Sequence, residues 1–327
     1  MKTHNLFTDF NGKIRLTSSK KSKLKSNRDA LRKRISNYFE KQGWDMPKFH
    51  SQGSSPLDTN LNPIKKTNDD GDIIEEYDLD DGVYFICPED ERKQSSTYHD
   101  RIKRAVQGHT EKVVDKDTCV RVIYTDGHHI DLPPYWLEKD GDTPKLAHKS
   151  KGFTDSDPRE FKNWVDGKIS QTSIVGQLRR DIRFLKAWKD HREDTNKSLK
   201  LPSGFILTIL ACNNYRSNQG DDVSFRETVK AIKNALDSSF SCYRPTTPTD
   251  EDLLTDYDKD SVLAELDNVI HHAEAAEATD CGKEASEHWR KVFGDRFPLG
   301  KKKESTPRKA PYAPPKKVQA DNPWLQE

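Results

Sequence analysis

The chain has 327 residues, of which 32% are hydrophobic and 33% are charged, a composition typical of one large domain or two closely packed lobes. Its 55 Lys and Arg residues nearly balance its 54 Asp and Glu residues, which gives a formal net charge of +1. This balance argues against a general nucleic-acid binder, because such proteins usually carry a clear excess of basic residues.

The cysteines and the hydrophobic runs indicate a soluble, cytoplasmic protein. The five cysteines are widely spaced and form no CxxC pair, so we expect reduced thiols rather than a zinc ribbon or a disulfide framework. The first residues lack the apolar core of a signal peptide. The longest apolar run, residues 205–212, is far too short to cross a bilayer, so we expect no membrane contact.

The first predicted element is a long amphipathic helix over residues 24–41, which Gly43 ends. Its apolar positions recur at helical spacing and are Leu24, Leu31, Ile35, Tyr38 and Phe39. The opposite face is strongly basic. This face is either simply solvated, as on most surface helices, or it attracts triphosphates.

Two β-rich segments follow. The segment IIEEYDLDDGVYFIC, residues 73–87, is predicted to form one or two strands around a group of acids. The segment at 119–136 is predicted to form a strand pair with a hairpin turn at Asp126-Gly127. Pro133-Pro134 is predicted to end the second of these strands, because proline cannot donate to a sheet ladder.

After about residue 150 the pattern becomes helical. One helix is predicted from an apolar stripe of Val175, Leu178, Ile182, Leu185 and Trp188. A buried helix follows at 203–215 with Ser203 as its N-cap. Another covers 262–276 with Asp260 or Ser261 as its N-cap, and a short one runs through HWRKVF at 288–293.

The last segment, from residue 298 to 327, is rich in Lys, Pro and polar residues and is predicted to be disordered. Two interpretations of it stay open. It is a solubilising extension, or Trp324 and Leu325 anchor a docking peptide for a partner protein.

Three short features carry the chemistry, and their order matters more than any one alone. They are the Gly53-Ser54 turn, the Asp78-Leu79-Asp80 segment on a strand, and Asp131 on a later strand. Because alternate residues of a strand share a face, Asp78 and Asp80 should project together, roughly 6–7 Å apart. Asp81 should then point away from them.

Unpaired carboxylates at such a distance repel, and shared divalent cations would stabilise them. Mg²⁺ prefers carboxylate oxygens together with phosphates and water. With Asp131 on a neighbouring strand, Asp78 and Asp80 would complete a two-metal site. The small Gly53-Ser54 turn would let backbone N–H groups and a hydroxyl approach a phosphate closely.

The chain resembles a known family at these positions and beyond them. The segments HSQGSSPLDTNLNP, EEYDLDDGVYF, HHIDLPPY and LRRDIRFLKAWKD are similar, in this order, to the cGAS/DncV-like nucleotidyltransferases. The similarity is strongest to the DncV branch of bacterial cyclic GMP-AMP synthases. It covers roughly residues 5–297 and includes the PSGF and VFGDRF segments.

The resemblance implies an α+β fold, in which a polymerase-β-like nucleotidyltransferase core with a mixed sheet packs on a helical C-terminal lobe. The core would comprise residues 1–150 with the long N-terminal helix, the lobe would comprise residues 151–297, and residues 298–327 would form the tail. The active site would lie in the cleft between core and lobe.

The resemblance also implies roles for individual residues. Asp78, Asp80 and Asp131 would be catalytic and would bind two Mg²⁺ ions, with Mn²⁺ as an alternative metal. The residues that would bind nucleotide are Gln52, Gly53, Ser54, Arg121, Lys186 and Ser203. For Lys186 a solvated helix face, and for Ser203 a simple N-cap, are equally good interpretations.

The implied reaction is the synthesis of a cyclic dinucleotide, cyclic GMP-AMP above all, from ATP and GTP with release of pyrophosphate. The product would activate a separate effector protein in bacterial anti-phage defence. The alternatives are a cyclic trinucleotide or other cyclic oligonucleotide, an RNA-tailing activity, or an inactive nucleotide-binding sensor module. No His/Cys cluster of the DNA-gripping kind occurs, so we expect no DNA requirement.

Four histidines stand in pairs that could suggest metal ligands. His128-His129 lie close to Asp131, but oxygen ligands suit Mg²⁺ better than imidazole, so we expect His129 to be structural or to support the site from outside. His271-His272 lie in a predicted helix without an HExxH pattern and are expected at the surface.

Overall fold

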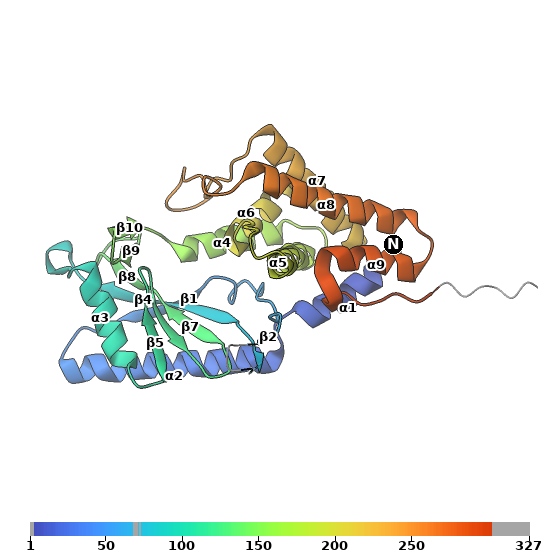
Figure 1. The fold of residues 1–327 in the computed structure, drawn as a ribbon. Coiled ribbons are helices and arrows are strands. Elements are labelled where there is room, and N and C mark those ends of the chain that lie inside the picture. Colours follow the sequence, from blue (N-terminus) through green and yellow to red (C-terminus); the bar gives the residue numbers. More distant parts are fainter. Residues whose placement is uncertain (1–2, 68–70, 72, 303–327) are drawn as a thin grey trace, which may run out of the picture.

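The computed structural model describes residues 3–67, 71 and 73–302. A mixed β-sheet packs against α2 on one face, and a group of helices lies on the other side of the molecule (Figure 1). This arrangement confirms the predicted α+β class. No helix in the described ranges is both long and apolar enough to span a membrane.

The main sheet has the strand order β10-β9-β8-β4-β7-β6-β5, and β1 pairs with β4 outside this path. A separate two-stranded ribbon pairs β2 with β3. The strand bounds are β1 Lys48–Gln52, β2 Lys66–Thr67, β3 Ile73–Ile74, β4 Asp78–Ile86, β5 Lys112–Asp115, β6 Val120–Ile123, β7 His129–Leu132, β8 Pro134–Leu137, β9 Lys145–His148 and β10 Gly152–Asp155.

β4 lies at the centre of this sheet and has three neighbours. It runs antiparallel to β1, and parallel to β7 along its first half and to β8 along its second half. Its residues 82–85 are buried, as expected for a strand covered on both faces. The first residues of β4, which carry the acids, therefore lie between the ends of β1 and β7.

The prediction at Pro133-Pro134 was half right. β7 ends at Leu132, as expected, but a new strand, β8, begins at Pro134. The Pro133 carbonyl accepts a hydrogen bond of 2.9 Å from the Val83 N–H, so the prolines redirect the chain along β4 instead of taking it out of the sheet. Proline is tolerated there because the first residue of a strand need not donate.

The predicted hairpin is confirmed, since β6 and β7 are antiparallel with Arg121 opposite Asp131. The predicted long helix is also confirmed, but it begins earlier. Helix α2, Ser18–Gln42, starts after Thr17, whose hydroxyl accepts a hydrogen bond from the Lys20 N–H, and ends at Gly43 with a left-handed backbone. Its apolar stripe packs against the sheet, together with α3, Ser95–Val106.

The helical half has its own hydrophobic core. Its helices are α4 Pro158–Ser170, α5 Gln177–Thr195, α6 Gly204–Asn214, α7 Asp221–Ser238, α8 Lys259–Ala278 and α9 Gly282–Phe293, and the short 3₁₀ helices are η1 Glu89–Glu91, in the sheet half, and η2 Gly294–Arg296. As predicted, Ser203 caps α6, because its hydroxyl accepts a hydrogen bond from the Ile206 N–H.

Two details of the helical half differ from the sequence prediction. Val175 lies before α5 and is 92% exposed, because Gly176 begins the helix after it; the other four residues of the stripe are buried. The N-cap of α8 is Asp258, not Asp260 or Ser261, and its carboxylate accepts a hydrogen bond of 2.8 Å from the Ser261 N–H.

Four helices of the described residues were not predicted individually, namely α1, α3, α4 and α7. Helix α1, His4–Ile14, precedes the sheet in sequence but packs into the helical core, next to α9 in Figure 1. Phe7 and Phe10 are fully buried there. They contact the rings of Phe184, Trp289, Phe293 and Phe297. The proposed division near residue 150 stays a prediction, and α1 joins its two sides.

We expect Phe7→Ala to lower the free energy of unfolding by about 3–5 kcal/mol, because it removes a ring at the centre of this aromatic cluster and leaves a cavity. Chemical denaturation followed by tryptophan fluorescence would measure the loss. Thr8→Ala, at an exposed position on the same helix, is the control and should change the unfolding free energy by less than about 1 kcal/mol. Equal losses in the two variants would contradict a buried anchor at Phe7.

Candidate active site

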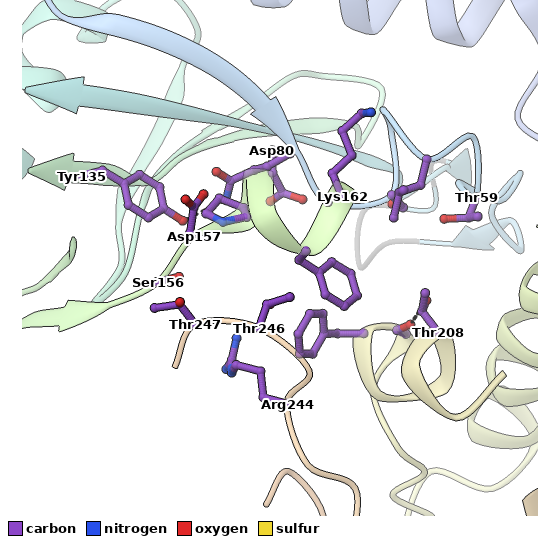
Figure 2. Close-up of a pocket in the computed structure, with 18 of the residues that line it drawn as sticks. Thr59, Asp80, Tyr135, Ser156, Asp157, Lys162, Thr208, Arg244, Thr246 and Thr247 are labelled. Atoms are coloured by element: carbon purple, nitrogen blue, oxygen red, sulfur yellow. Dashed lines mark hydrogen bonds between the residues drawn. The ribbon is translucent and has the colours of Figure 1, made fainter. Parts of the chain in front are cut away.

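A cavity of about 340 Å³ lies where the sheet meets the helical half (Figure 2). This volume falls in the range of small-molecule sites. β1, β4 and β8 form one wall, and α4, α5, α6 and the loop before α8 form the other. Five of the residues predicted to bind metal or nucleotide line it directly, namely Gln52, Gly53, Ser54, Asp80 and Lys186.

The three predicted metal-binding aspartates stand on adjacent strands. Asp78 and Asp80 are alternate residues of β4, so their side chains share one face of the sheet. Asp131 is the direct neighbour of Asp80 in the parallel pairing of β4 with β7, and His129 is the neighbour of Asp78. The sheet register thus gathers residues 51 positions apart in the chain at one place.

The surroundings of Asp80 disfavour a free carboxylate. Burial raises the pKa of Asp80 well above its usual range, and the negative charges of Asp78 and Asp131 raise it further. Arg121 and Lys186 act in the opposite direction but do not outweigh burial. A cation placed among these carboxylates would relieve this electrostatic strain.

Asp131 is held by an arginine. Arg121, its partner across β6 and β7, donates two hydrogen bonds to its carboxylate, from Nε at 2.7 Å and from Nη2 at 2.6 Å. In the described ranges no three His, Cys, Asp or Glu side chains converge closely enough to form a ready metal cluster. The donor set still suits Mg²⁺ in chemistry, because carboxylate oxygens are its preferred ligands, but Asp131 would have to leave Arg121 to join it.

The turn after β1 lies directly against Asp80. Gly53 has a φ of 71°, in the left-handed region. A Cβ added at Gly53 would lie 3.3 Å from Asp80 Cγ and closer still to Oδ2, so only glycine lets the backbone pass here. The neighbouring Gln52 side chain donates a 3.1 Å hydrogen bond to the Tyr135 hydroxyl, which fixes it against β8.

Lys186 extends from α5 towards the same place. Its Nζ lies 3.2 Å from the Thr59 hydroxyl and 3.4 Å from the Thr59 carbonyl, to which it donates hydrogen bonds. Burial lowers its pKa to about 8. The interpretation of Lys186 as a solvated helix face is therefore wrong, because the ammonium is buried beside the cavity.

Ser203 and Arg121 are not among the residues that line the cavity. Ser203 is the N-cap of α6, and it is the next residue, Gly204, that lines the cavity against Lys186. Arg121 faces Asp131. Whether either of them contacts a nucleotide stays a prediction.

Asp81 and His128 are both held by hydrogen bonds to neighbouring protein side chains. Asp81 faces α2, as expected: Arg32 donates to it from Nε at 2.7 Å and from Nη2 at 2.5 Å, and Ser51 donates at 2.9 Å. His128 is fully buried and hydrogen-bonds Asn27 and Asp126, so it has no free metal-binding nitrogen. The pKa of His129 is lowered by burial and by Arg121.

The second histidine pair is only partly at the surface. His271 is exposed, as expected, but His272 is half-buried because α9 packs over it. Its Nδ1 lies 3.5 Å from Nδ1 of His288.

Several residues that line the cavity were not predicted from the sequence. They are Tyr135, Asp157, Phe161, Phe205, Arg244, Thr246 and Thr247. One of them had a local signal, because Asp157-Pro158 is a typical N-cap followed by proline at the first helical position. The others come from β8, α4, α6 and the loop before α8, which are far apart in the sequence, and have no such pattern.

Comparisons with known proteins find matches over much of the chain. Residues 1–168 match the family of the Second Messenger Oligonucleotide or Dinucleotide Synthetase domain. The cyclic GMP-AMP synthase of Escherichia albertii is 25% identical over 205 residues, which are 61% of this chain and 44% of that protein. The cyclic GMP-AMP synthase of Vibrio cholerae is 25% identical over 307 residues, 76% of this chain and 67% of that protein.

Solved structures show the same fold. The crystal structure of Vibrio cholerae DncV cyclic AMP-GMP synthase with nonhydrolyzable GTP has a TM-score of 0.75 and 21% identity, covering 90% of this chain and 96% of that one. The structure with the linear intermediate 5′ pppA(3′,5′)pG has a TM-score of 0.73 and 20% identity, covering 91% and 98%. The chain therefore belongs to the second messenger oligonucleotide or dinucleotide synthetase family, in the DncV branch of the cGAS/DncV-like nucleotidyltransferases.

Proposed function

We propose that this chain joins nucleoside triphosphates into a cyclic dinucleotide and releases pyrophosphate, with cyclic GMP-AMP from ATP and GTP as the expected product. The observation that carries the proposal is the register of β4 and β7, which sets Asp80 beside Asp131 at a cavity lined by Gly53, Ser54 and Lys186. Relatives named as cyclic GMP-AMP synthases support the choice of product.

The residues would divide the work as follows. Asp78, Asp80 and Asp131 would hold two Mg²⁺ ions, or Mn²⁺ in their place. Bound ions would polarise the phosphate and lower the pKa of the attacking ribose hydroxyl. The Gly53 turn and the Ser54 hydroxyl would position the triphosphate, and the Lys186 ammonium would balance its charge. Arg121 would hold Asp131 in place until the metal-bound state forms.

The same proposal extends to the wider arrangement of the protein. Residues 1–150 would form the catalytic core, and residues 151–297 would form the lobe that closes on the nucleotides. The tail at 298–327 lies almost wholly outside the described residues. It would be a solubilising extension or a docking segment. The product would activate a separate effector protein in anti-phage defence in the cytoplasm, without a need for DNA.

Product analysis tests the proposal. The purified chain is mixed with all four nucleoside triphosphates and Mg²⁺, and the products are analysed by mass spectrometry with and without phosphatase. A phosphatase-resistant cyclic dinucleotide is the expected result. A compact product one nucleotide larger would favour the cyclic trinucleotide alternative, and a ladder that needs added RNA would favour tailing.

No product with any nucleotide, together with intact nucleotide binding, would favour the alternative of an inactive sensor module. The three aspartates argue against this alternative, because a sensor has no need for adjacent carboxylates that repel one another without metal. The same assay with EDTA checks the metal, and product formation in its presence would contradict the proposed two-metal site.

Lys186 gives the proposal a pH signature. Because its pKa is about 8, the ammonium is charged below that pH and increasingly neutral above it, so we expect the KM for nucleoside triphosphate to rise between pH 8 and 9.5. Lys186→Arg keeps its charge over this range and should flatten the rise. Initial rates at several substrate concentrations would measure it, and an undiminished rise in Lys186→Arg would assign the pH dependence to another group.

A further inference from the structure

The end of the cavity far from Asp80 has a different character from the end next to it. Asp80 and Arg244 lie at opposite ends of the lining in Figure 2. The rings of Phe161 and Phe205, which both line the cavity, have centroids 4.5 Å apart, and the Arg244 guanidinium lies 5.0 Å from the Phe205 ring centre. Flat aromatic and guanidinium surfaces of this kind are the usual partners of a nucleotide base.

Arg244 is held in position by a short antiparallel contact. Its backbone N–H donates to the Glu251 carbonyl at 2.9 Å, and its Nε donates to the Glu251 carboxylate at 2.6 Å. Tyr243 and Asp252 form a β-bridge beside it. Glu251 therefore holds the Nε side of the guanidinium, and within the described ranges no acceptor is bonded to its two Nη groups.

The other charged groups of the cavity are already engaged or lie elsewhere. The Asp157 carboxylate accepts two hydrogen bonds from the Arg159 side chain and also caps α4. Lys162 is paired with Asp166 at 2.6 Å. Asp80 lies at the opposite end. Besides Arg244, this end offers the side chains of Thr246 and Thr247.

This set of groups distinguishes guanine from adenine. Guanine presents two adjacent acceptors, O6 and N7, which an arginine binds with two N–H donors. Adenine presents an amino donor in place of O6, which would face the donors of Arg244 unfavourably. Among the described residues that line this end, none has a carboxylate free to bind the N1–H and the amino group on the other edge of guanine.

We propose that Arg244, clamped by Glu251 and stacked over Phe205, selects guanine for the base that enters this end of the cavity. The inference rests on the proposed function, because it assumes that the triphosphate lies at the Gly53 end. It assigns the nucleotide in this cavity as GTP and makes Arg244 a specificity-determining residue.

Binding measurements on the full chain test the inference without relying on turnover. Isothermal titration with Mg²⁺ and α,β-methylene analogues would compare guanosine, adenosine, inosine and 7-deazaguanosine triphosphates. Inosine keeps O6 and N7 and should bind like guanosine. Adenosine should bind roughly tenfold or more weakly, and 7-deazaguanosine, which lacks N7, should be intermediate. Since these comparisons use the unmodified protein, a folding defect cannot affect them.

Variants then assign the preference to the residue. Arg244→Ala should weaken guanosine binding to the adenosine level while adenosine binding changes little. Arg244→Lys should retain only part of the preference, because it lacks the two-donor fork. Arg104→Ala, on the surface of α3 with its partner Asp100, is the matched control and should bind all analogues as the wild type does.

The outcomes separate this inference from the proposed function. Equal losses of guanosine and adenosine binding in Arg244→Ala would overturn guanine selection. Arg244 would then contribute only stacking or charge to the binding of either nucleotide. Weak inosine binding with strong 7-deazaguanosine binding would also overturn it, because the base would then be read at its other edge. If no triphosphate binds the wild type at all, the proposed function fails together with it.

Discussion

Asp80→Asn is expected to reduce product formation roughly 10³-fold or more, while the folded protein becomes as stable as the wild type or more stable. The loss follows because the amide cannot hold a divalent ion as a carboxylate does, and metal electrostatics should supply several kcal/mol of barrier reduction. The stability follows because burial and two neighbouring carboxylates already raise the pKa of Asp80. Initial rates and thermal unfolding of the same preparations would measure both.

The stability of Asp80→Asn relative to the wild type should depend on pH. Because the folded-state pKa of Asp80 is raised, ionisation of Asp80 destabilises the fold as the pH rises above its unfolded value, and Asn removes this penalty. The stability advantage of Asp80→Asn should therefore be absent at pH 3 and present at pH 7. An unchanged rate, or a lower unfolding temperature at pH 7, would contradict the proposed role of this carboxylate.

Asp81 provides the control variant. Unlike Asp80→Asn, Asp81→Asn should lose stability and keep its activity. Asp81 is fully buried on the other side of β4 and binds Arg32 and Ser51. Asp81→Asn should lower the free energy of unfolding by about 1–3 kcal/mol, because one side of a buried ion pair is lost. Product formation per folded molecule should stay within a few-fold of the wild type, since the proposed metal-binding face of β4 is intact.

Gly53→Ala is the second variant with a large expected effect. The added Cβ would meet the Asp80 carboxylate, and alanine would have to adopt a φ of 71°, which is unfavourable for any residue with a side chain. We expect product formation to fall roughly 10²-fold, because a displacement of the turn or of Asp80 by about 1 Å disrupts the geometry of the reaction. The free energy of unfolding should fall by about 1–3 kcal/mol.

Gly152→Ala separates the two contributions. Gly152 has nearly the same backbone conformation, with a φ of 72°, but a Cβ added there meets no atom within 4 Å. It should therefore show only the backbone penalty, about 1 kcal/mol, and no change in product formation. If Gly53→Ala lost no more activity than Gly152→Ala, the close approach of the turn to Asp80 would have no catalytic importance.

The chain's local patterns were sufficient for the parts of the site that depend on neighbours in sequence. The alternation of Asp78 and Asp80 follows from strand geometry, and so does the opposite direction of Asp81. The N-cap at Ser203 and the turn at Gly53 are likewise set by interactions within a few residues. Such features can be read from the sequence because nothing distant has to be known.

Contacts between residues far apart in the sequence determined the other features of the site. The two-donor grip of Arg121 on Asp131 depends on the register of β6 and β7. The burial that lowers the pKa of Lys186 depends on how α5 packs against the turn at Thr59. Neither register nor helix packing is encoded in a short segment, because both are set by the total fit of apolar faces across the core.

The Arg244 end of the cavity shows the same limit of sequence-based prediction most clearly. Phe161, Phe205 and Arg244 come from α4, α6 and a loop, and each looks unremarkable in its own segment. Helix α1 is similar, since its Phe7 and Phe10 find their partners near the other end of the chain. The sequence by itself determined the order of the acids, the Gly53 turn and the Ser203 cap, whereas the folded chain alone decided which distant side chains meet, because long-range packing is a property of the whole core.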